Sequence, residues 1–404
     1  MAKVPDNYTL FAASLLLSYG GIADYTDNLA QQFRRRKRLR GVVTPYPGHM
    51  VRDYDVKIFD IEPDRRPTHF DKWKIGSKIM TFFYFVRLYI SSCRELKKLG
   101  LHKKNEYLIF TEYYTVHFDI IIFCARLLNI KYAIVFHGLD LICARKHQFM
   151  HFNRNFRKAE FIIYNSEATR KLASDLHGVN HKRTMILWPG IDVAALEKYR
   201  SPENTKTFFK RHRKEIIFAT VARLVRRKGI DLAIRMVCEL AKSNREIRYY
   251  IAGTGEEDIK LKALVKELKG EEFIFFLGDI SNEEKYALLE ASDIFLFSNH
   301  SSGNNDFEGF GISCIEASFF GNVIIGGHHG GVKEAVLEGK TGFLFDFDDP
   351  QSLEEALATI KKCIDDPELI ERIKMQGNKY VKAMYDWNQL IQQFTKAEQE
   401  LFIA

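Results

Sequence analysis

Short apolar runs rich in β-branched and aromatic residues alternate with longer helical patterns along most of the chain. This alternation is typical of parallel α/β sheets. We expect strands at residues 8–17, 41–44, 107–110, 132–136, 161–164, 184–187, 215–221, 248–252, 273–277, 294–297, 323–325 and 342–345. These strands are too many for one compact Rossmann sheet, so the pattern predicts an α/β protein with two Rossmann-like, doubly wound domains.

A polar segment at residues 192–214 separates the two series of strands. We therefore expect a first domain over residues 1–200 and a second over residues 201–384. Two such domains facing each other would form a ligand cleft between the carboxyl ends of their sheets. Residues 385–404 have the pattern of an amphipathic helix, which could cross back to the first domain.

The composition is that of a soluble globular protein with an anionic partner. The 404 residues are 46% hydrophobic and 28% charged, with a net charge of +8, which excludes disordered and fibrous classes and favours a nucleotide, a nucleic acid or an anionic membrane as partner. The cysteines form no disulfide framework or zinc pattern, so a reducing cytoplasm is the simplest location. We expect no signal peptide and no membrane-spanning helix, because the apolar stretch at residues 79–90 is too short.

The run EGFGISCIEAS sets two carboxylates, Glu308 and Glu316, eight positions apart across a glycine-bracketed turn. Gly309 and Gly311 allow the backbone to approach a ligand, and a helix beginning near Gly311 would offer N–H groups to an anion. Glu316 would lie inside that helix, where its carboxylate could accept hydrogen bonds from hydroxyls. The alternative is a turn flanked by two solvated glutamates.

Two sites after expected strands of the first domain are further candidates. Gly20 and Gly21 open a helix, a position suited to a phosphate or a sugar hydroxyl, but the loop lacks the GxGxxG pattern of dinucleotide cofactors. His137 ends a strand, where α/β folds place functional side chains. Each could equally be structural.

A basic loop follows the first strand of the second domain. Arg223 can form a fork of hydrogen bonds to phosphate oxygens, and Lys228 can add a point charge beside it. Such a pair suits a diphosphate. We expect Arg226 and Arg227 to be solvated.

These motifs, together with WPGID at residues 188–192 and GGVKEAV at residues 330–336, resemble the retaining GT-B glycosyltransferases of family 4, the glycosyl transferases group 1. The resemblance covers nearly the whole chain and implies the GT-B fold, with two Rossmann-like domains facing a central cleft. It implies that Arg223 and Lys228 hold the donor diphosphate. It also implies that Glu316 binds the ribose hydroxyls and Glu308 the hydroxyls of the transferred sugar.

The resemblance places further residues at the donor site. His137 would lie near the far hydroxyl of the sugar. The residues implied to bind the donor through backbone amides or the pocket wall are Gly20, Gly21, Gly253, Ile280, Ser298, Phe310, Gly311 and Ile312. The segment 299–306 resembles a longer loop of mannosyltransferase-like members, which favours a GDP-linked donor over a UDP-linked one.

The chemistry of these residues predicts a transferase without a metal or other cofactor. Fixed cations and a helix end can stabilise the departing diphosphate, so Mg²⁺ would be unnecessary. Two acidic patterns, residues 53–55 and 346–348, resemble the DxD motif that binds Mn²⁺ in another fold, but we interpret both as turns. Retention could involve a covalent intermediate or attack on the same face, and we favour the second.

Six cations between Arg34 and Arg40, with further lysines and arginines around the aromatic residues 82–85, could rest on anionic lipid. The alternative is a solvated helix end beside an ordinary core helix. We predict a cytoplasmic hexosyltransferase, free or at the inner face of the membrane, that moves mannose to a cell-envelope glycan or lipid-linked acceptor. The alternatives are a UDP-sugar transferase for glucose, galactose or N-acetylglucosamine, a non-catalytic sugar-nucleotide sensor, and a basic nucleic-acid-binding protein.

Overall fold

The computed structural model describes residues 4–12, 20–45, 55–59, 75–101, 105–178, 180–200, 215–243, 246–301 and 306–403, with the backbone alone at 75–82 and 403. The chain divides into two compact units, Met1–Trp188 with Ile391–Ala404, and Pro189–Leu390. We expected the boundary near residue 200, but Ile191 N–H donates to Tyr385 O at 2.8 Å and Trp387 N–H donates to Ile191 O at 3.1 Å. These bonds hold the WPGID segment to the second unit.

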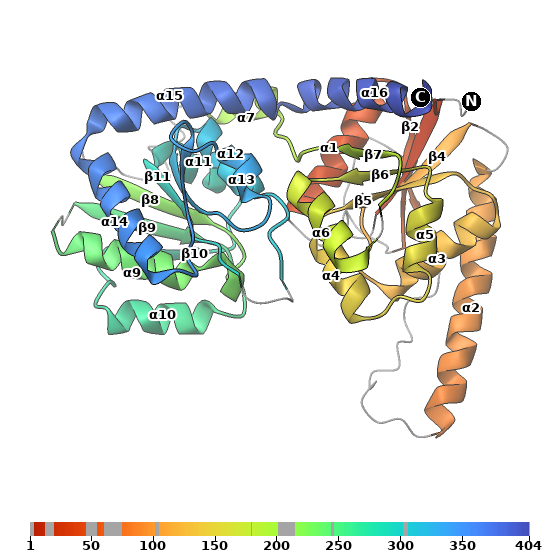
Figure 1. Cartoon of the computed structure of the whole chain (residues 1–404). Coiled ribbons are helices and arrows are strands. Elements are labelled where there is room, and N and C mark those ends of the chain that lie inside the picture. The colour runs from red at the N-terminus through yellow and green to blue at the C-terminus, as the bar shows by residue number, and fades with distance from the viewer. Residues whose placement is uncertain are drawn as a thin grey trace. The chain divides into compact units, whose positions relative to one another are not determined.

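The first unit is built on a seven-stranded parallel sheet in the order β3-β2-β1-β4-β5-β6-β7 (Figure 1). Its strands are β1 (Asn7–Phe11), β2 (Leu39–Thr44), β3 (Val56–Ile58), β4 (Glu106–Phe110), β5 (Tyr132–Phe136), β6 (Phe161–Tyr164) and β7 (Thr184–Ile186). Its helices are α1 (Gly21–Arg35), α2 (Ile75–Leu99), α3 (Val116–Leu127), α4 (Leu139–Lys146), α5 (Phe152–Lys158) and α6 (Glu167–His177). Because β4, β5 and β6 are buried throughout, they appear in the sequence as continuous apolar runs.

The second unit is built on a six-stranded parallel sheet in the order β10-β9-β8-β11-β12-β13. Its strands are β8 (Ile216–Val221), β9 (Ile247–Ala252), β10 (Ile274–Gly278), β11 (Ile294–Phe297), β12 (Val323–Gly327) and β13 (Gly342–Phe345). Its helices are α7 (Val193–Leu196), η3 (Glu197–Tyr199), η4 (Arg226–Lys228), α9 (Ile230–Ala241), α10 (Asp258–Glu267), α11 (Asn282–Ala291), α12 (Ile312–Phe319), α13 (Val332–Ala335), α14 (Pro350–Asp365) and α15 (Pro367–Met384). In Figure 1, α9 and α10 cover one face of this sheet, and α11 and α12 cover the other.

Both sheets are doubly wound, which confirms the expected fold class. In each, the strand order reverses direction once, between β1 and β4 in the first unit and between β8 and β11 in the second. Ligands of open α/β sheets bind outside the carboxyl ends of the strands at such a reversal. The loops after β8 and β11 are therefore the first place to look for a site.

Helix α16 (Trp387–Ile403) begins in the second unit and continues into the first. In the first unit, the ring of Phe394 lies edge-on to Tyr8 at 6.1 Å, and Phe402 lies edge-on to Tyr107 at 5.7 Å. The final helix thus supplies part of the apolar packing around β1 and β4. No described helix contains an apolar run long enough to cross a membrane.

Part of the basic cluster at residues 34–40 is used inside the first unit. The Arg38 guanidinium donates to both carboxylate oxygens of Glu398, at 2.7 and 2.9 Å, and Arg40 forms an ion pair with Glu106. Glu398 is fully buried, so its carboxyl group needs this hydrogen-bonding partner. Two of the six cations expected on the surface therefore hold the fold together.

Candidate functional site

The loops that follow β8 and β11 are joined by a direct contact between their backbones. Gly229 lies between η4 and α9 in a left-handed conformation with φ 59°, and a Cβ there would meet Ser298 O at 1.9 Å. The Ser298 hydroxyl donates to Gly229 O at 2.6 Å. Ser298, expected in the donor pocket, here fixes η4 against the end of β11, and its contact with a donor stays a prediction.

This joint brings together two cations and two carboxylates. Lys228 Nζ donates to Glu308 Oε2 at 2.6 Å, and Arg227 Nη1 donates to the same oxygen. Arg227 Nε also donates to Asp306 Oδ1 at 2.7 Å. We call Arg227, Lys228, Asp306 and Glu308 the ion cluster.

The expectation that Arg227 is solvated is wrong. Arg227 is only 8% exposed, whereas its neighbour Arg226 is exposed. A buried guanidinium is tolerated only when anions compensate its charge, and Asp306 and Glu308 do so here. The sequence carried one signal for this residue, namely the two acids at positions 306 and 308, but nothing that matched them to Arg227 rather than Arg226.

The ion cluster keeps Glu308 ionised. Burial alone would raise the pKa of Glu308, but the charges of Lys228, Arg227 and Arg223 outweigh burial and hold this pKa below its ordinary value. Burial also lowers the pKa of Lys228, and Glu308 offsets that effect only in part. The carboxylate therefore acts as a hydrogen-bond acceptor at neutral pH.

The other side of Lys228 faces the start of α12. Lys228 Nζ lies 4.3 Å from the centre of the Phe297 ring, and that ring lies 3.7 Å from where a Cβ on Gly311 would be. Gly311 is the N-cap residue of α12, with φ 99°. Because the first N–H groups of a helix have no partner within it, this end of α12 can receive an anion next to Lys228. The expected helix start is thus confirmed.

Arg223 is exposed and lies close enough to Glu308 to contribute to its lowered pKa, after burial and the larger effects of Lys228 and Arg227. The loop that carries Arg223 lies beside the loop that follows β9, and a hydrogen bond from Leu224 N–H to Thr254 O, at 2.9 Å, joins the two loops. Gly253, with φ 129°, permits this approach, since a Cβ there would meet Ala222 O at 1.9 Å. Gly253 therefore supports the loop that carries Arg223, and its contact with a nucleotide remains a prediction.

Glu316 lies on α12 but has different partners from Glu308. Its Oε1 accepts from Lys285 Nζ at 2.8 Å and from the Tyr286 hydroxyl at 3.5 Å. Both partners lie on α11, which follows Ile280 and begins with a capping box formed by Ser281 and Glu284. The sequence reasoning missed Lys285, which resembles an ordinary surface lysine on a helix.

His137 and the glycine pair belong to the first unit. His137 is 7% exposed, and its Nε2 lies 2.9 Å from Thr111 O. Since a carbonyl only accepts, Nε2 carries the proton and Nδ1 is the acceptor. Burial lowers the pKa of His137 to about 4, so the ring is neutral at pH 7. Gly20 and Gly21 are exposed at the start of α1, and residues 13–19, which precede them, lie outside the described residues.

The structure thus gathers Lys228, Glu308 and Gly311 at one corner of the second sheet, with Arg223 nearby. Phe310 is buried there with its ring 5.6 Å from that of Tyr385, and Ile312 is the first residue of α12. Residues 302–305 of the expected mannosyltransferase-like loop lie outside the described residues.

A family described as "Glycosyl transferases group 1" matches residues 203–380, which include the ion cluster. A glycosyltransferase of Escherichia coli strain K12 named for colanic acid biosynthesis is 26% identical over 263 residues, 65% of this chain and 62% of the relative. A GDP-mannose-dependent phosphatidylinositol monomannoside mannosyltransferase of Mycolicibacterium smegmatis is 30% identical over 172 residues, 42% of this chain and 44% of that protein.

Among solved structures, HepE of Anabaena in complex with UDP-glucose has a TM-score of 0.73 and 18% identity, covering 98% of this chain and 99% of that one. That likeness shows the fold, which is GT-B. The matches with the first curated relatives span only about 60% of their length. The chain thus has the GT-B fold, and its residues 203–380 match the family of glycosyl transferases group 1.

Proposed function

We propose that this protein is a retaining glycosyltransferase that moves a hexose from a nucleotide-diphosphate sugar to a glycan or lipid-linked acceptor. The observation that carries the proposal is the buried pairing of Lys228 with Glu308 beside the start of α12. The pairing lies where the strand order reverses, the position at which such sheets bind nucleotides.

The ion cluster has the charges that a donor diphosphate requires. Two cations and two carboxylates balance in the cluster, and Arg223 adds an exposed positive charge at its edge. An arriving diphosphate would receive hydrogen bonds from Lys228, Arg223 and the first N–H groups of α12. Arg227 would then keep Glu308 ionised and in place.

Glu308 in this arrangement would bind the transferred sugar. A carboxylate with a lowered pKa accepts hydrogen bonds from sugar hydroxyls without donating a proton. Arg227 is a positioning residue, because it acts through Glu308 and Asp306. Glu316 would accept from the ribose hydroxyls, with Lys285 holding its carboxylate ready.

Transfer proceeds by attack on the same face of the sugar as the leaving group. The bond between the anomeric carbon and the diphosphate oxygen breaks, the acceptor oxygen bonds to that carbon, and the acceptor proton passes to the departing phosphate. Glu308 is committed to Arg227 and Lys228, which leaves it poorly suited to act as a nucleophile. Fixed cations stabilise the leaving group, so the chemistry requires no metal.

We infer that mannose from GDP-mannose is the preferred donor. Support comes from the GDP-mannose-dependent relative, which is 30% identical over 172 residues. The alternative is a UDP-sugar donor. A calorimetric screen of GDP-mannose against UDP-glucose, UDP-galactose and UDP-N-acetylglucosamine tests this choice. The inference fails if a UDP-sugar binds more tightly than GDP-mannose.

We further propose that the acceptor is presented at an anionic membrane surface. Helix α2 carries an exposed stripe at helical spacing, made of Phe83, Arg87, Ile90, Arg94 and Lys97. Phe83 is 61% exposed and Ile90 64%, so two apolar groups lie among three cations. In a flotation assay, the wild type should rise with vesicles that contain phosphatidylglycerol. Less of the double variant Phe83→Ser/Ile90→Ser should rise with them. Equal flotation of the two proteins would contradict this part of the proposal.

A further inference from the structure

Two histidines and an aspartate meet at the carboxyl ends of β12 and β13. His328 and His329 directly follow β12, and Asp346 directly follows β13. The two strands pair in parallel with Gly327 opposite Phe345, so the next residues of both strands emerge side by side. One ligand atom from each of His328, His329 and Asp346 lies within 4.8 Å of the others.

The spacing of these atoms is close to that of ligands around a tetrahedral metal ion. His329 Nε2 lies 3.2 Å from Asp346 Oδ1, and His328 Nε2 lies 3.8 Å from Asp346 Oδ2. Metal bonds of about 2.0–2.1 Å in a tetrahedral site place neighbouring ligand atoms about 3.3 Å apart. One pair of ligand atoms already has this spacing, and the others would have to close from separations of up to 4.8 Å for the side chains to share one ion.

The surroundings of the histidines also fit a metal site. His328 Nδ1 lies 3.3 Å from Phe345 O, to which it can donate, and this leaves Nε2 as the atom facing Asp346. A ligating histidine typically donates its other ring N–H to a carbonyl or carboxylate in this way. The backbone N–H of His328 donates to the same carbonyl at 2.9 Å, which fixes the start of the loop.

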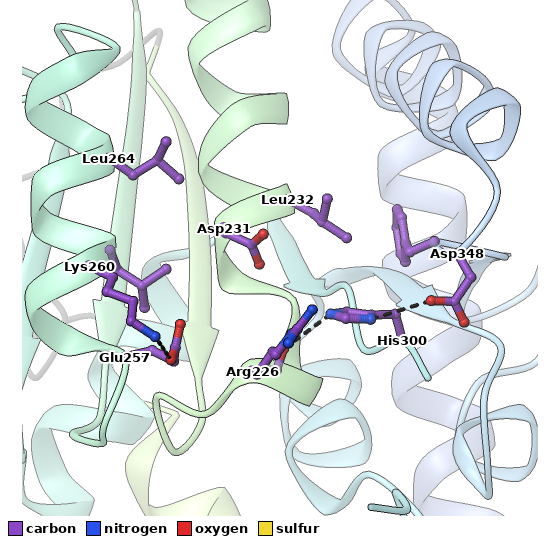
Figure 2. Close-up of a pocket in the computed structure, with 10 residues that line it drawn as sticks. Arg226, Asp231, Leu232, Glu257, Lys260, Leu264, His300 and Asp348 are labelled. Atoms are coloured by element: carbon purple, nitrogen blue, oxygen red, sulfur yellow. Dashed lines mark hydrogen bonds and ion pairs between the residues drawn. The ribbon is translucent and has the colours of Figure 1, made fainter. Parts of the chain in front are cut away.

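Asp348 offers a fourth donor. Its Oδ2 lies 2.9 Å from His329 Nε2, and its Oδ1 lies 3.4 Å from His300 Nδ1. Figure 2 shows Asp348 directed towards His300 at the edge of a cavity of about 490 Å³, which Arg226 and Lys260 also line. The segment 346–348 is a turn, as the sequence indicated, but its carboxylates face histidines that the sequence analysis did not single out.

We propose that His328, His329 and Asp346 bind one divalent cation of the Zn²⁺ class, with Asp348 available as the fourth ligand. Imidazole nitrogen with carboxylate oxygen suits Zn²⁺ and its first-row neighbours rather than Mg²⁺ or Ca²⁺. The histidine side chains are 31% exposed and that of Asp346 is 44% exposed, so an ion can enter from solvent. The site is separate from the ion cluster, which contains no imidazole.

A bound cation would brace the loop that supports Glu308. Gly331 N–H donates to Glu308 O at 2.9 Å, and the Asn299 amide donates to His329 O at 3.2 Å. Tying His328 and His329 to Asp346 would fix one end of this loop to β13. The cation is thus a structural ligand, and its binding does not depend on the proposed transfer reaction.

Equilibrium dialysis against Zn²⁺, with the bound metal measured by mass spectrometry, tests the site. The control variant is His147→Asn, which replaces an exposed histidine outside the site. The wild type and this control should each bind one more equivalent of Zn²⁺ than His329→Asn and Asp346→Asn do, or should bind Zn²⁺ at least tenfold more tightly. Equal stoichiometry and affinity in all four proteins would overturn the proposal.

Cobalt provides a readout on the unmutated protein. Co²⁺ bound tetrahedrally by nitrogen and oxygen ligands should give a visible absorption band that Zn²⁺ abolishes by competition, without the near-ultraviolet band of thiolate ligands. A spectrum no different from that of free aqueous Co²⁺, or one dominated by thiolate bands, would contradict the site even if the variants failed to fold.

Discussion

Lys228 Nζ lies 2.6 Å from Glu308 Oε2, and the two side chains are only 11% and 12% exposed. The sequence analysis assigns each residue to the donor substrate, whereas the structure pairs the two residues with each other. A lysine and a glutamate buried together pay desolvation costs that their attraction offsets only with good geometry and further partners. Arg227 is that further partner, and we infer that the ion cluster forms before any ligand binds.

Replacing Arg227 should lower the stability of the protein. Arg227→Ala leaves Asp306 and Glu308 with fewer compensating charges, and breaking a buried ion pair costs about 3 kcal/mol or more. The free energy of unfolding, measured with urea, should fall by about that amount. Arg226→Ala is the matched control, because Arg226 belongs to the same short helix but is exposed. Similar losses in the two variants would refute the role assigned to Arg227.

Glu308→Gln should make the stability of the protein less sensitive to acid. The pKa of Glu308 is lowered in the fold, so its ionised form adds stability above its unfolded pKa, and that stability is lost as pH falls through the folded value. The wild type should therefore lose more stability than Glu308→Gln on acidification below about pH 4.5. Parallel stability curves for the two proteins would show that Glu308 is not held ionised.

The stability that depends on neutral His137 should also be lost on acidification, although His137 gains a positive charge where Glu308 loses a negative one. Burial lowers its pKa from 6.5 to about 4, so its contribution is complete above pH 6.5 and is lost as pH falls towards 4. The stability lost over that pH range is about 3 kcal/mol. Asp140, whose pKa burial raises to about 7, titrates in the opposite sense, so the test is the difference between wild type and His137→Gln. Glutamine keeps a donor for Thr111 O but does not titrate, and a pH-independent difference would contradict the prediction.

Replacing Glu316 should weaken the binding of nucleotides that carry ribose hydroxyls. Hydrogen bonds to a charged group contribute about 1.5–3 kcal/mol, so Glu316→Gln should weaken nucleotide binding about tenfold to a hundredfold. The same substitution should have little effect on a 2′,3′-dideoxynucleotide, which lacks the hydroxyls. Lys285→Met tests whether the lysine contact at 2.8 Å positions the carboxylate. An equal loss for ribose and dideoxyribose nucleotides on replacing Glu316 would remove the ribose assignment.

The strands were predictable because burial leaves a direct mark on the sequence. The expected bounds of the strands Tyr132–Phe136, Phe161–Tyr164, Ile294–Phe297 and Gly342–Phe345 agree with the structure. The short strand Val56–Ile58 was missed. It lies at the edge of its sheet, and two of its three residues are exposed, so it leaves no apolar run.

The partners within the site could not be predicted in the same way. Arg227 and Glu308 are 81 positions apart, and only the return of the chain from β8 to β11 brings them together. Local sequence can show that Glu308 follows a strand and precedes a helix, but it cannot choose between Arg226 and Arg227 as its partner. His328 and Asp346 were missed for the same reason, since they meet only through the pairing of β12 with β13.

The most direct test of the account is the affinity of Lys228→Met for a nucleoside diphosphate, compared with that of the wild type by calorimetry. GDP and UDP are both titrated, and the corresponding monophosphates serve as controls. The account predicts that the diphosphate that binds wild type loses about tenfold to a hundredfold in affinity, because a charged hydrogen bond is removed, while the monophosphate changes much less. An unchanged diphosphate affinity in Lys228→Met, or a wild type that binds neither diphosphate, would contradict it.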